Sequence, residues 1–197
     1  MNPYKILGLL IYFSYYISFY IKLFLQKRHG ITTIQIGRGS KPKRTHIIEV
    51  VFAAVFLLAA AIQIAGILLV DILPVFILNN WIRYFGIMIS ASGIIVLDIS
   101  MAALGDSWRG GLDYNQRTEL ITTGIYKFSR NPAFVGFDLF FIGMSLLFSN
   151  IINLTVSGIL ILVIHQQIAD EEKFLTAVFG DKYLDYQRKT GKYFGRK

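Results

Sequence analysis

The sequence predicts an all-α protein of the polytopic membrane class. Hydrophobic residues make up 54% of the 197 residues and charged residues only 16%, which is too apolar for an ordinary soluble domain. The apolar residues gather into runs that are long enough to cross a bilayer as helices. We therefore expect one membrane domain, residues 1–197, with about five transmembrane helices.

Five apolar segments account for these helices. They are residues 6–25, 47–70, 81–104, 132–148 and 151–168. Only Ser149 and Asn150 separate the last two segments, so these two must form an antiparallel helical hairpin. Each of the two is short for a full crossing, which tilting or bilayer thinning can accommodate. A cleavable signal peptide is the alternative for the first segment, but its apolar run is too long and no small-residue cleavage site follows it.

The C-terminal part is amphipathic and charged. We predict one helix from Asp170 to about Phe179 and a second from Asp181 to Thr190, with Gly180 between them. Residues 1–104 would supply three spans, and residues 105–197 would form the functional core.

A polar loop turns into a membrane helix at Asn131 and Pro132. Asparagine is a favourable N-cap, and proline fits the first helical position because its missing N–H would have no partner there. The positive end of the helix dipole would then lie beside Arg130, where it could bind an anion. The alternative is that this Asn-Pro pair only marks a helix start.

The positions of the basic residues predict the orientation in the membrane. All of the 20 Lys and Arg residues except Lys5, Lys22 and Arg83 lie in the first connection (residues 26–46), the third connection (residues 105–131) or the C-terminal tail (residues 169–197). With five spans these three regions share one side, so the N-terminus is expected outside and the C-terminus in the cytoplasm. Anionic lipid headgroups are the expected partners of these loops. We do not expect nucleic acid binding, because stacking aromatics do not alternate with the basic residues.

Ionisable groups inside the expected helices are candidate functional residues. Asp98 and Asp138 each lie six residues inside the same membrane boundary, about 9 Å along a helix, and His165 lies near that depth on the fifth segment. We predict Asp98 and Asp138 as catalytic candidates and His165 as a substrate-binding candidate. The alternative is that they are polar links between helices. No metal site is expected, because cysteine is absent and the three histidines are far apart.

Below this layer the sequence places Arg130 and the start of a helix, the pair Trp108-Arg109, and the acidic run 170–172. Such groups suit an amino-acid nucleoside such as S-adenosylmethionine, but a nucleotide or a phospholipid headgroup would need similar partners. These residues by themselves predict a small-molecule site on the cytoplasmic face.

Two motifs resemble the isoprenylcysteine carboxyl methyltransferase family, whose superfamily includes phospholipid N-methyltransferases. The first is 123–136, with the turn Arg-Asn-Pro-Ala-Phe-Val-Gly, and the second is 171–186, with Glu-Glu, Phe-Gly and two tyrosines. The resemblance extends over 104–194 and implies S-adenosylmethionine as the methyl donor and a lipophilic acceptor that enters sideways from the bilayer. The residues that it assigns to the cofactor are Gly124, Tyr126, Arg130, Asn131, Pro132, Phe134, Gly136, Glu171, Glu172, Tyr183 and Tyr186.

Arg109 is the residue that we expect to orient an anionic acceptor, with Trp108 and His165 also at the substrate. Methyl transfer to an ionised carboxylate needs no general base, so the protein would position the reactants and exclude water. An amine acceptor would need a base, for which Asp98, Asp138 and His165 are candidates.

The chain departs from the family at three positions. Asn131 stands where many relatives have His, Phe134 where they have Tyr, and Gln167 where several have Arg. A prenylcysteine-like carboxylate is the favoured acceptor, and a phospholipid amine, a small thiol and a fatty or isoprenoid acid are alternatives. An NADPH-dependent enzyme similar to the sterol reductases and a non-catalytic lipid-binding or transport protein are further alternatives.

Overall fold

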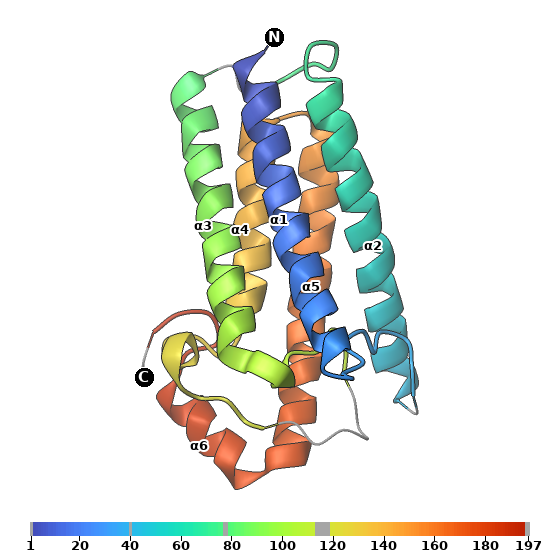
Figure 1. Cartoon of the computed structure of the whole chain (residues 1–197), viewed down its shortest axis with the longest axis vertical. Helices are drawn as coiled ribbons and strands as arrows, with labels where there is room; N and C mark the ends of the chain where they lie inside the picture. The colour runs from blue at the N-terminus through green and yellow to red at the C-terminus, as the bar shows by residue number, and fades with distance from the viewer. Residues whose placement is uncertain (1, 40, 77–78, 113–118, 196–197) are drawn as a thin grey trace.

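The computed structural model describes residues 2–39, 41–76, 79–112 and 119–195 (Figure 1). The helices are α1 (Pro3–Arg28), α2 (Lys43–Leu68), α3 (Asn80–Leu104), α4 (Pro132–Leu147), α5 (Ile151–Phe179) and α6 (Asp181–Lys189), with two 3₁₀ turns, η1 (Gly105–Ser107) and η2 (Gly124–Lys127). An isolated extended bridge pairs Ile34 with Gly110. Arg117, Arg196 and Lys197, which contributed to the predicted orientation, lie outside the described residues.

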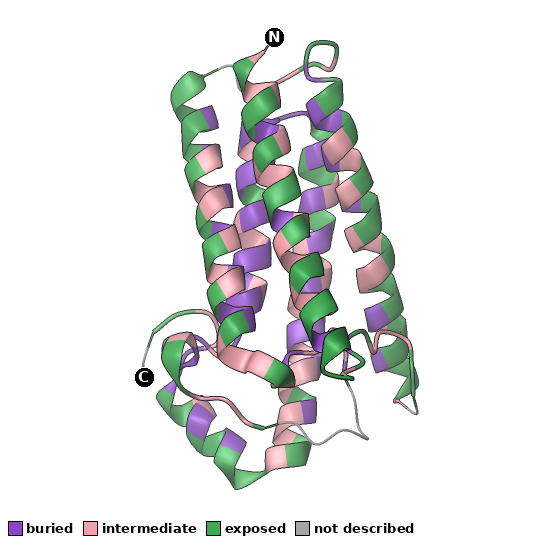
Figure 2. Ribbon diagram, in the orientation of Figure 1, coloured by how far each residue is buried: buried purple, intermediate pink, exposed green. Residues whose placement is uncertain are grey.

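Helices α1 to α5 stand side by side as a bundle, and α6 lies across one end of it (Figure 1). By length and composition, α1, α2, α3 and α5 are long and apolar enough to cross a membrane. Helix α4 has 16 residues, or about 24 Å, and is shorter than a hydrocarbon core of roughly 30 Å. Buried residues gather on α4 and on the inward sides of its neighbours (Figure 2). The prediction of an all-α polytopic membrane protein is confirmed.

Asparagine side chains cap three of the helix starts. The side-chain oxygens of Asn2, Asn79 and Asn150 accept hydrogen bonds of 2.8 to 3.1 Å from backbone N–H groups two or three residues further on. Asn131 occupies the same position before α4, but its side chain makes no capping hydrogen bond. The prediction that the Asn131 side chain caps α4 is therefore wrong, and the reason lies in the partners described below.

The fifth apolar segment and the charged segment after it form one helix. Helix α5 continues through Asp170 to Phe179 because no glycine or proline stands between positions 159 and 179, so the prediction of a separate helix from Asp170 is wrong. Its last turns extend past the ends of the other bundle helices (Figure 1). The chain then turns at Gly180, whose φ of 53° favours glycine, and α6 runs back beneath the bundle.

Helix α3 packs more extensively against α4 than any other two helices pack together. Glycines bring the two backbones close. A Cβ atom on Gly93 would lie 2.7 Å from the carbonyl oxygen of Gly136, and one on Gly143 would lie 2.5 Å from that of Gly86. These contacts are shorter than side chains tolerate, so the packing depends on glycine at these positions.

We expect Gly143→Ala to destabilise the protein by about 1–3 kcal/mol, because the new methyl group forces α3 and α4 apart. Gly158→Ala is the matched control: its Cβ would have no atom within 4 Å, so the better helix propensity of alanine should leave stability unchanged or higher. Thermal unfolding in detergent compares the two variants. Equal midpoints would contradict this account of the interface.

Candidate active site

A cavity of about 430 Å³ lies where the bundle meets α6. This volume falls within the roughly 300–1,000 Å³ of small-molecule sites. Its polar and aromatic lining residues from the segments between η1 and α6, which we call the polar wall, are Trp108, Arg109, Tyr126, Arg130, Asn131, Gln167, Glu171, Tyr183 and Tyr186. Its lining residues from α1, α2 and the inner part of α4, which we call the apolar wall, are Phe19, Tyr20, Leu23, Phe52, Phe56, Leu57 and Phe137.

Arg130 connects α5 with the end of α6. Its Nε and Nη2 atoms donate to Oε1 of Glu172 at 3.0 and 2.8 Å, and its Nη1 donates to the carbonyl oxygen of Thr190 at 2.6 Å. The side chains of Arg130 and Glu172 are only 8% and 15% exposed. The guanidinium is therefore used mainly to hold the protein together at the edge of the cavity.

Asn131 contributes to the same junction. Its Nδ2 donates to Oε1 of Glu172 and to the carbonyl oxygen of Lys192, both at 3.1 Å. These bonds direct the amide away from the start of α4, which explains the missing cap. The first N–H groups of α4 have no intrahelical partner by geometry, and Ala133 and Phe134, which carry two of them, line the cavity.

Glu171 faces the cavity, whereas Glu172 faces Arg130. Burial, together with the neighbouring carboxylates of Glu172 and Glu49, raises the pKa of Glu171 from 4.5 to about 7. Glu171 lies in the part of α5 beyond the predicted span, next to the loops and α6. It is therefore a carboxyl group that can be neutral or ionised near neutral pH.

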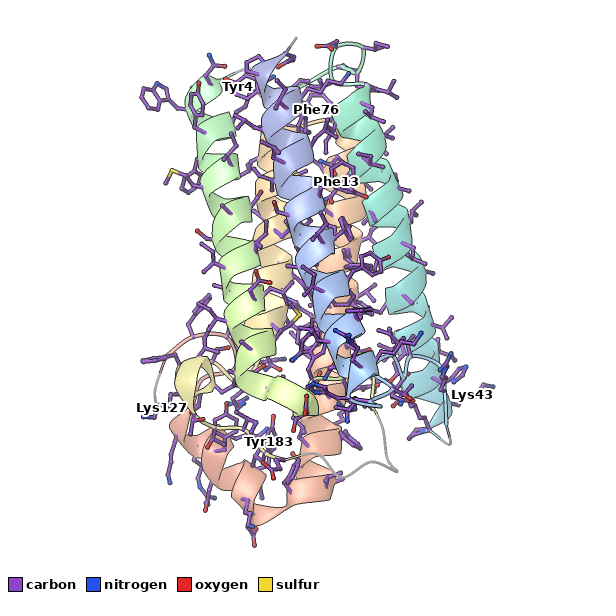
Figure 3. All side chains as sticks on the ribbon, in the orientation of Figure 1. Tyr4, Phe13, Lys43, Phe76, Lys127 and Tyr183 are labelled. Atoms are coloured by element: carbon purple, nitrogen blue, oxygen red, sulfur yellow. The ribbon has the colours of Figure 1, made fainter. Side chains whose placement is uncertain are left out.

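Three tyrosines, Tyr126, Tyr183 and Tyr186, belong to the polar wall together with this carboxyl group. The Tyr186 hydroxyl donates to the carbonyl oxygen of Tyr126 at 2.6 Å. Tyr183 is 1% exposed, and its hydroxyl has no hydrogen-bond partner within the described ranges. Figure 3 places Tyr183 between α6 and the bundle, whereas Lys43 and Lys127 project outward. Burial raises the pKa of all three tyrosines, so their hydroxyls stay protonated.

Trp108 and Arg109 follow η1, where α3 ends. Trp108 is 7% exposed, and its Nε1 has no hydrogen-bond partner among the residues described. Arg109 donates from Nη1 to the carbonyl oxygens of Asp106, at 2.6 Å, and Trp108, at 2.8 Å. Both side chains line the cavity, so the structure brings them together with the motif residues as predicted.

Three of the predicted cofactor residues shape the backbone near the cavity. Pro132 is buried at the first position of α4, and Gly124, with a φ of 60°, begins η2. Gly136 faces α3, where a Cβ atom would lie 2.8 Å from the carbonyl oxygen of Gly93. These three residues shape the backbone around the site and do not line the cavity.

The predicted residues inside the helices lie away from the cavity wall. His165 and Asp138 meet, as predicted, with 3.6 Å between Nε2 and Oδ2, and the Tyr193 hydroxyl lies 3.4 Å from Nδ1 of His165. In the described part of the chain, Asp98 makes no hydrogen bond to either residue, and its Oδ1 is buried without a partner. Their positions suit the alternative of polar links between helices better than a catalytic role.

Glu49 on α2 is a residue of this site that the sequence analysis did not select. It is fully buried. Its Oε2 accepts hydrogen bonds from Lys41 Nζ at 2.8 Å and Gly37 N at 2.9 Å, and its Oε1 accepts one from Leu112 N at 2.7 Å. A lone acid in an apolar run was the available signal, because such groups usually have a function.

Glu49 holds two loops, residues 33–37 and 110–112, through the N–H groups of Gly37 and Leu112. We call these two loops the roof of the cavity. They pair through hydrogen bonds of Gly110, whose N–H donates to Thr33 and whose carbonyl oxygen accepts from Gln35. Ile34, Ile36 and residues 110–112 line the cavity. One buried carboxylate therefore fixes α2, the roof and the cavity volume beneath it.

The fold and the cavity define a polytopic helical membrane protein with a cavity of small-molecule size at one end of its bundle. The family profile described as phospholipid methyltransferase matches residues 81–182, just over half of the chain. The chain belongs to this family, and the relationship inferred from the motifs around Arg130 and Glu171 is confirmed.

Curated relatives carry a related name. The protein-S-isoprenylcysteine O-methyltransferase A of Arabidopsis thaliana is 27% identical over 109 residues, covering 54% of this chain and 55% of the relative. The protein-S-isoprenylcysteine O-methyltransferase of Schizosaccharomyces pombe is 38% identical over 71 residues, and that of Saccharomyces cerevisiae is 36% identical over 76; each match covers 36% of this chain and 30% of the relative. The chain thus matches only about a third to just over half of the length of these relatives.

Proposed function

We propose that this protein transfers a methyl group from S-adenosylmethionine to the carboxylate of a lipophilic, prenylcysteine-like acceptor at the cytoplasmic membrane face. The observation that carries the proposal is the cavity itself, which joins the polar wall near α6 to the apolar wall from α1 and α2. A polar methyl donor and a lipophilic methyl acceptor could bind there side by side. The names of the relatives support this acceptor class.

The part of the polar wall formed by Glu171, the start of α4 and α6 fits S-adenosylmethionine, which supplies a methyl group activated by its positively charged sulfur. Glu171 offers a carboxylate for hydroxyl or ammonium groups, and the Tyr183 hydroxyl has an unused hydrogen-bonding capacity. The uncapped start of α4 offers N–H groups to a carboxylate. Arg130, Asn131 and Glu172 would act indirectly, by holding α4, α5 and α6 around these groups.

The apolar wall fits a lipid chain. Tyr20 on α1 and Leu57 on α2 line the cavity and are also 62% and 66% exposed on the bundle surface. The cavity therefore reaches the surface that would face lipid, which supports sideways entry of the acceptor. Residues 1–104 would thus supply the lipid-binding half of the site.

The chain's own residues would position the acceptor and exclude water. A carboxylate is already ionised at neutral pH and needs no base, which agrees with Asp98, Asp138 and His165 lying off the cavity wall. Trp108 and Arg109 would orient the carboxylate, and the roof held by Glu49 would keep water out. A phospholipid amine is the second candidate, because Glu171 could accept a proton from it.

A labelled-methyl transfer assay tests this proposal. Purified protein in lipid nanodiscs is given methyl-labelled S-adenosylmethionine with N-acetyl-S-farnesylcysteine or with phosphatidylethanolamine, and the labelled product is identified. Label in a base-labile ester supports the carboxylate acceptor, and label in the phospholipid supports the amine. If S-adenosylhomocysteine shows no saturable binding by calorimetry, the proposal fails.

Affinity for S-adenosylhomocysteine should rise about tenfold between pH 6 and pH 8. With a pKa of about 7, Glu171 is mostly neutral at pH 6 and mostly ionised at pH 8, and the ionised form accepts hydrogen bonds from hydroxyl or ammonium groups more strongly. Calorimetry across this range measures the trend. Glu171→Gln should bind more weakly with a flat profile, whereas a flat profile in the unmodified protein would contradict this role.

A further inference from the structure

Gln167 carries an unused hydrogen-bond acceptor at the polar wall. The residue is 4% exposed, and its Oε1 makes no hydrogen bond in the parts of the chain that the structure describes. Buried amide oxygens are almost always paired, because an unpaired one loses its water without compensation. Since Gln167 lines the cavity, an N–H or O–H group of a ligand can complete this pairing.

The position of Gln167 indicates which ligand. Gln167 and Glu171 are four residues apart on α5, so they share one face of the helix with Gln167 about 6 Å further into the bundle. Glu171 belongs to the end where the proposed cofactor binds, and the apolar wall comes from positions further inside the bundle, such as Phe56 and Phe137. Gln167 is therefore placed where the polar head of the lipophilic acceptor would lie.

Trp108 adds the complementary group. Its indole N–H can only donate a hydrogen bond, it is buried, and it too lacks a partner among the described residues while lining the cavity. A ligand that pairs with both Trp108 and Gln167 must carry an oxygen acceptor and a hydrogen donor. A fatty or isoprenoid acid, ionised at neutral pH, has only acceptors. An N-acylated amino acid has both, because its amide N–H adjoins its carboxylate.

Resting on the proposed methyl transfer, we propose that Gln167 is a specificity-determining residue. Its Oε1 accepts a hydrogen bond from the amide N–H beside the carboxylate of the methyl acceptor, while Trp108 donates one to a carboxylate oxygen. Gln167 would thereby distinguish the prenylcysteine-like acceptor of the proposed function from acids that have no amide N–H. Simple lipophilic acids lack the amide N–H that would donate to Gln167.

Two methyl acceptors that carry the same farnesyl group test this proposal. N-acetyl-S-farnesylcysteine has the amide N–H, and S-farnesyl-3-mercaptopropionate lacks the whole acetylamino group. We expect the unmodified protein to prefer the first by about tenfold in kcat/KM, mainly through KM, which is the size of effect that one hydrogen bond gives. Gln167→Leu should reduce the preference to near one, with S-adenosylhomocysteine binding unchanged.

Gln63→Leu is the matched control. Gln63 on α2 is also buried with an unpaired amide, but it does not line the cavity, so its removal should leave the preference intact. If Gln167→Leu does not fold, Gln167→Met keeps the side-chain length and should give the same loss of preference. A preference that persists in a folded Gln167 variant, or equal loss of both acceptors, overturns the role of Gln167 alone. Methylation of neither acceptor by the unmodified protein overturns the proposed carboxylate acceptor as well.

Discussion

Glu49→Ala is expected to destabilise the protein by about 3–5 kcal/mol and to abolish acceptor methylation. The substitution leaves the ammonium group of Lys41, whose side chain is 2% exposed, buried without its carboxylate partner. It also removes the acceptor for the N–H groups of Gly37 and Leu112, which hold the two roof loops to α2. The cavity loses its roof along with the ion pair, so activity should fall even under conditions where the protein stays folded.

Thermal unfolding in detergent and the labelled-methyl assay measure the two effects. The double variant Lys41→Met/Glu49→Gln leaves no buried charge and keeps an amide oxygen for a roof N–H, so it should recover much of the lost stability. Asp106→Ala is the surface control: it removes a carboxylate from an exposed pair with His29, which should change stability by no more than about 1 kcal/mol. Glu49→Ala with unchanged stability, or a double variant no more stable than the single one, would refute this role.

The helices were predictable because run length alone decides whether a segment can span a membrane. What single segments do not reveal is where a side chain finds its partner. Glu49 interrupts an apolar run visibly, but its partners include Leu112, which lies 63 positions further along the chain. Such a contact depends on how α3 and the following loop fold back, and no local pattern encodes it.

The motif residues illustrate the same limit at shorter range. Glu171 and Glu172 look alike in the sequence, but adjacent helical residues point about 100° apart, since a turn takes 3.6 residues. Glu172 therefore meets Arg130, and Glu171 meets the cavity. The pairing of Asp138 with His165 was predictable from their matching depth. Their position off the cavity wall was not, because depth does not fix the direction in which a side chain points.

Arg130→Ala is expected to weaken S-adenosylhomocysteine binding by at least about a hundredfold, although Arg130 serves mainly as a connector. The substitution leaves Glu172 nearly buried without its cation, a loss of about 3–5 kcal/mol for such pairs, and removes the donors for the carbonyl oxygens of Gln187 and Thr190. Helix α6 would then detach from the cavity and take Tyr183 with it. Calorimetry in detergent measures the affinity, and hydrogen exchange over residues 181–195 measures the release of α6.

Two further variants separate a connector from a simple positive charge. Arg130→Lys keeps the charge but has one nitrogen in place of a planar fork, so it cannot bond Glu172 and the end of α6 together, and we expect little rescue. Arg188→Ala removes an exposed arginine of α6 that pairs with Asp185 on the surface, so it should bind normally. If Arg130→Lys restored full affinity while exchange over α6 stayed fast, charge at the cofactor end would matter more than the junction. Slow exchange with full affinity in Arg130→Ala would mean that α6 is held by its buried tyrosines alone.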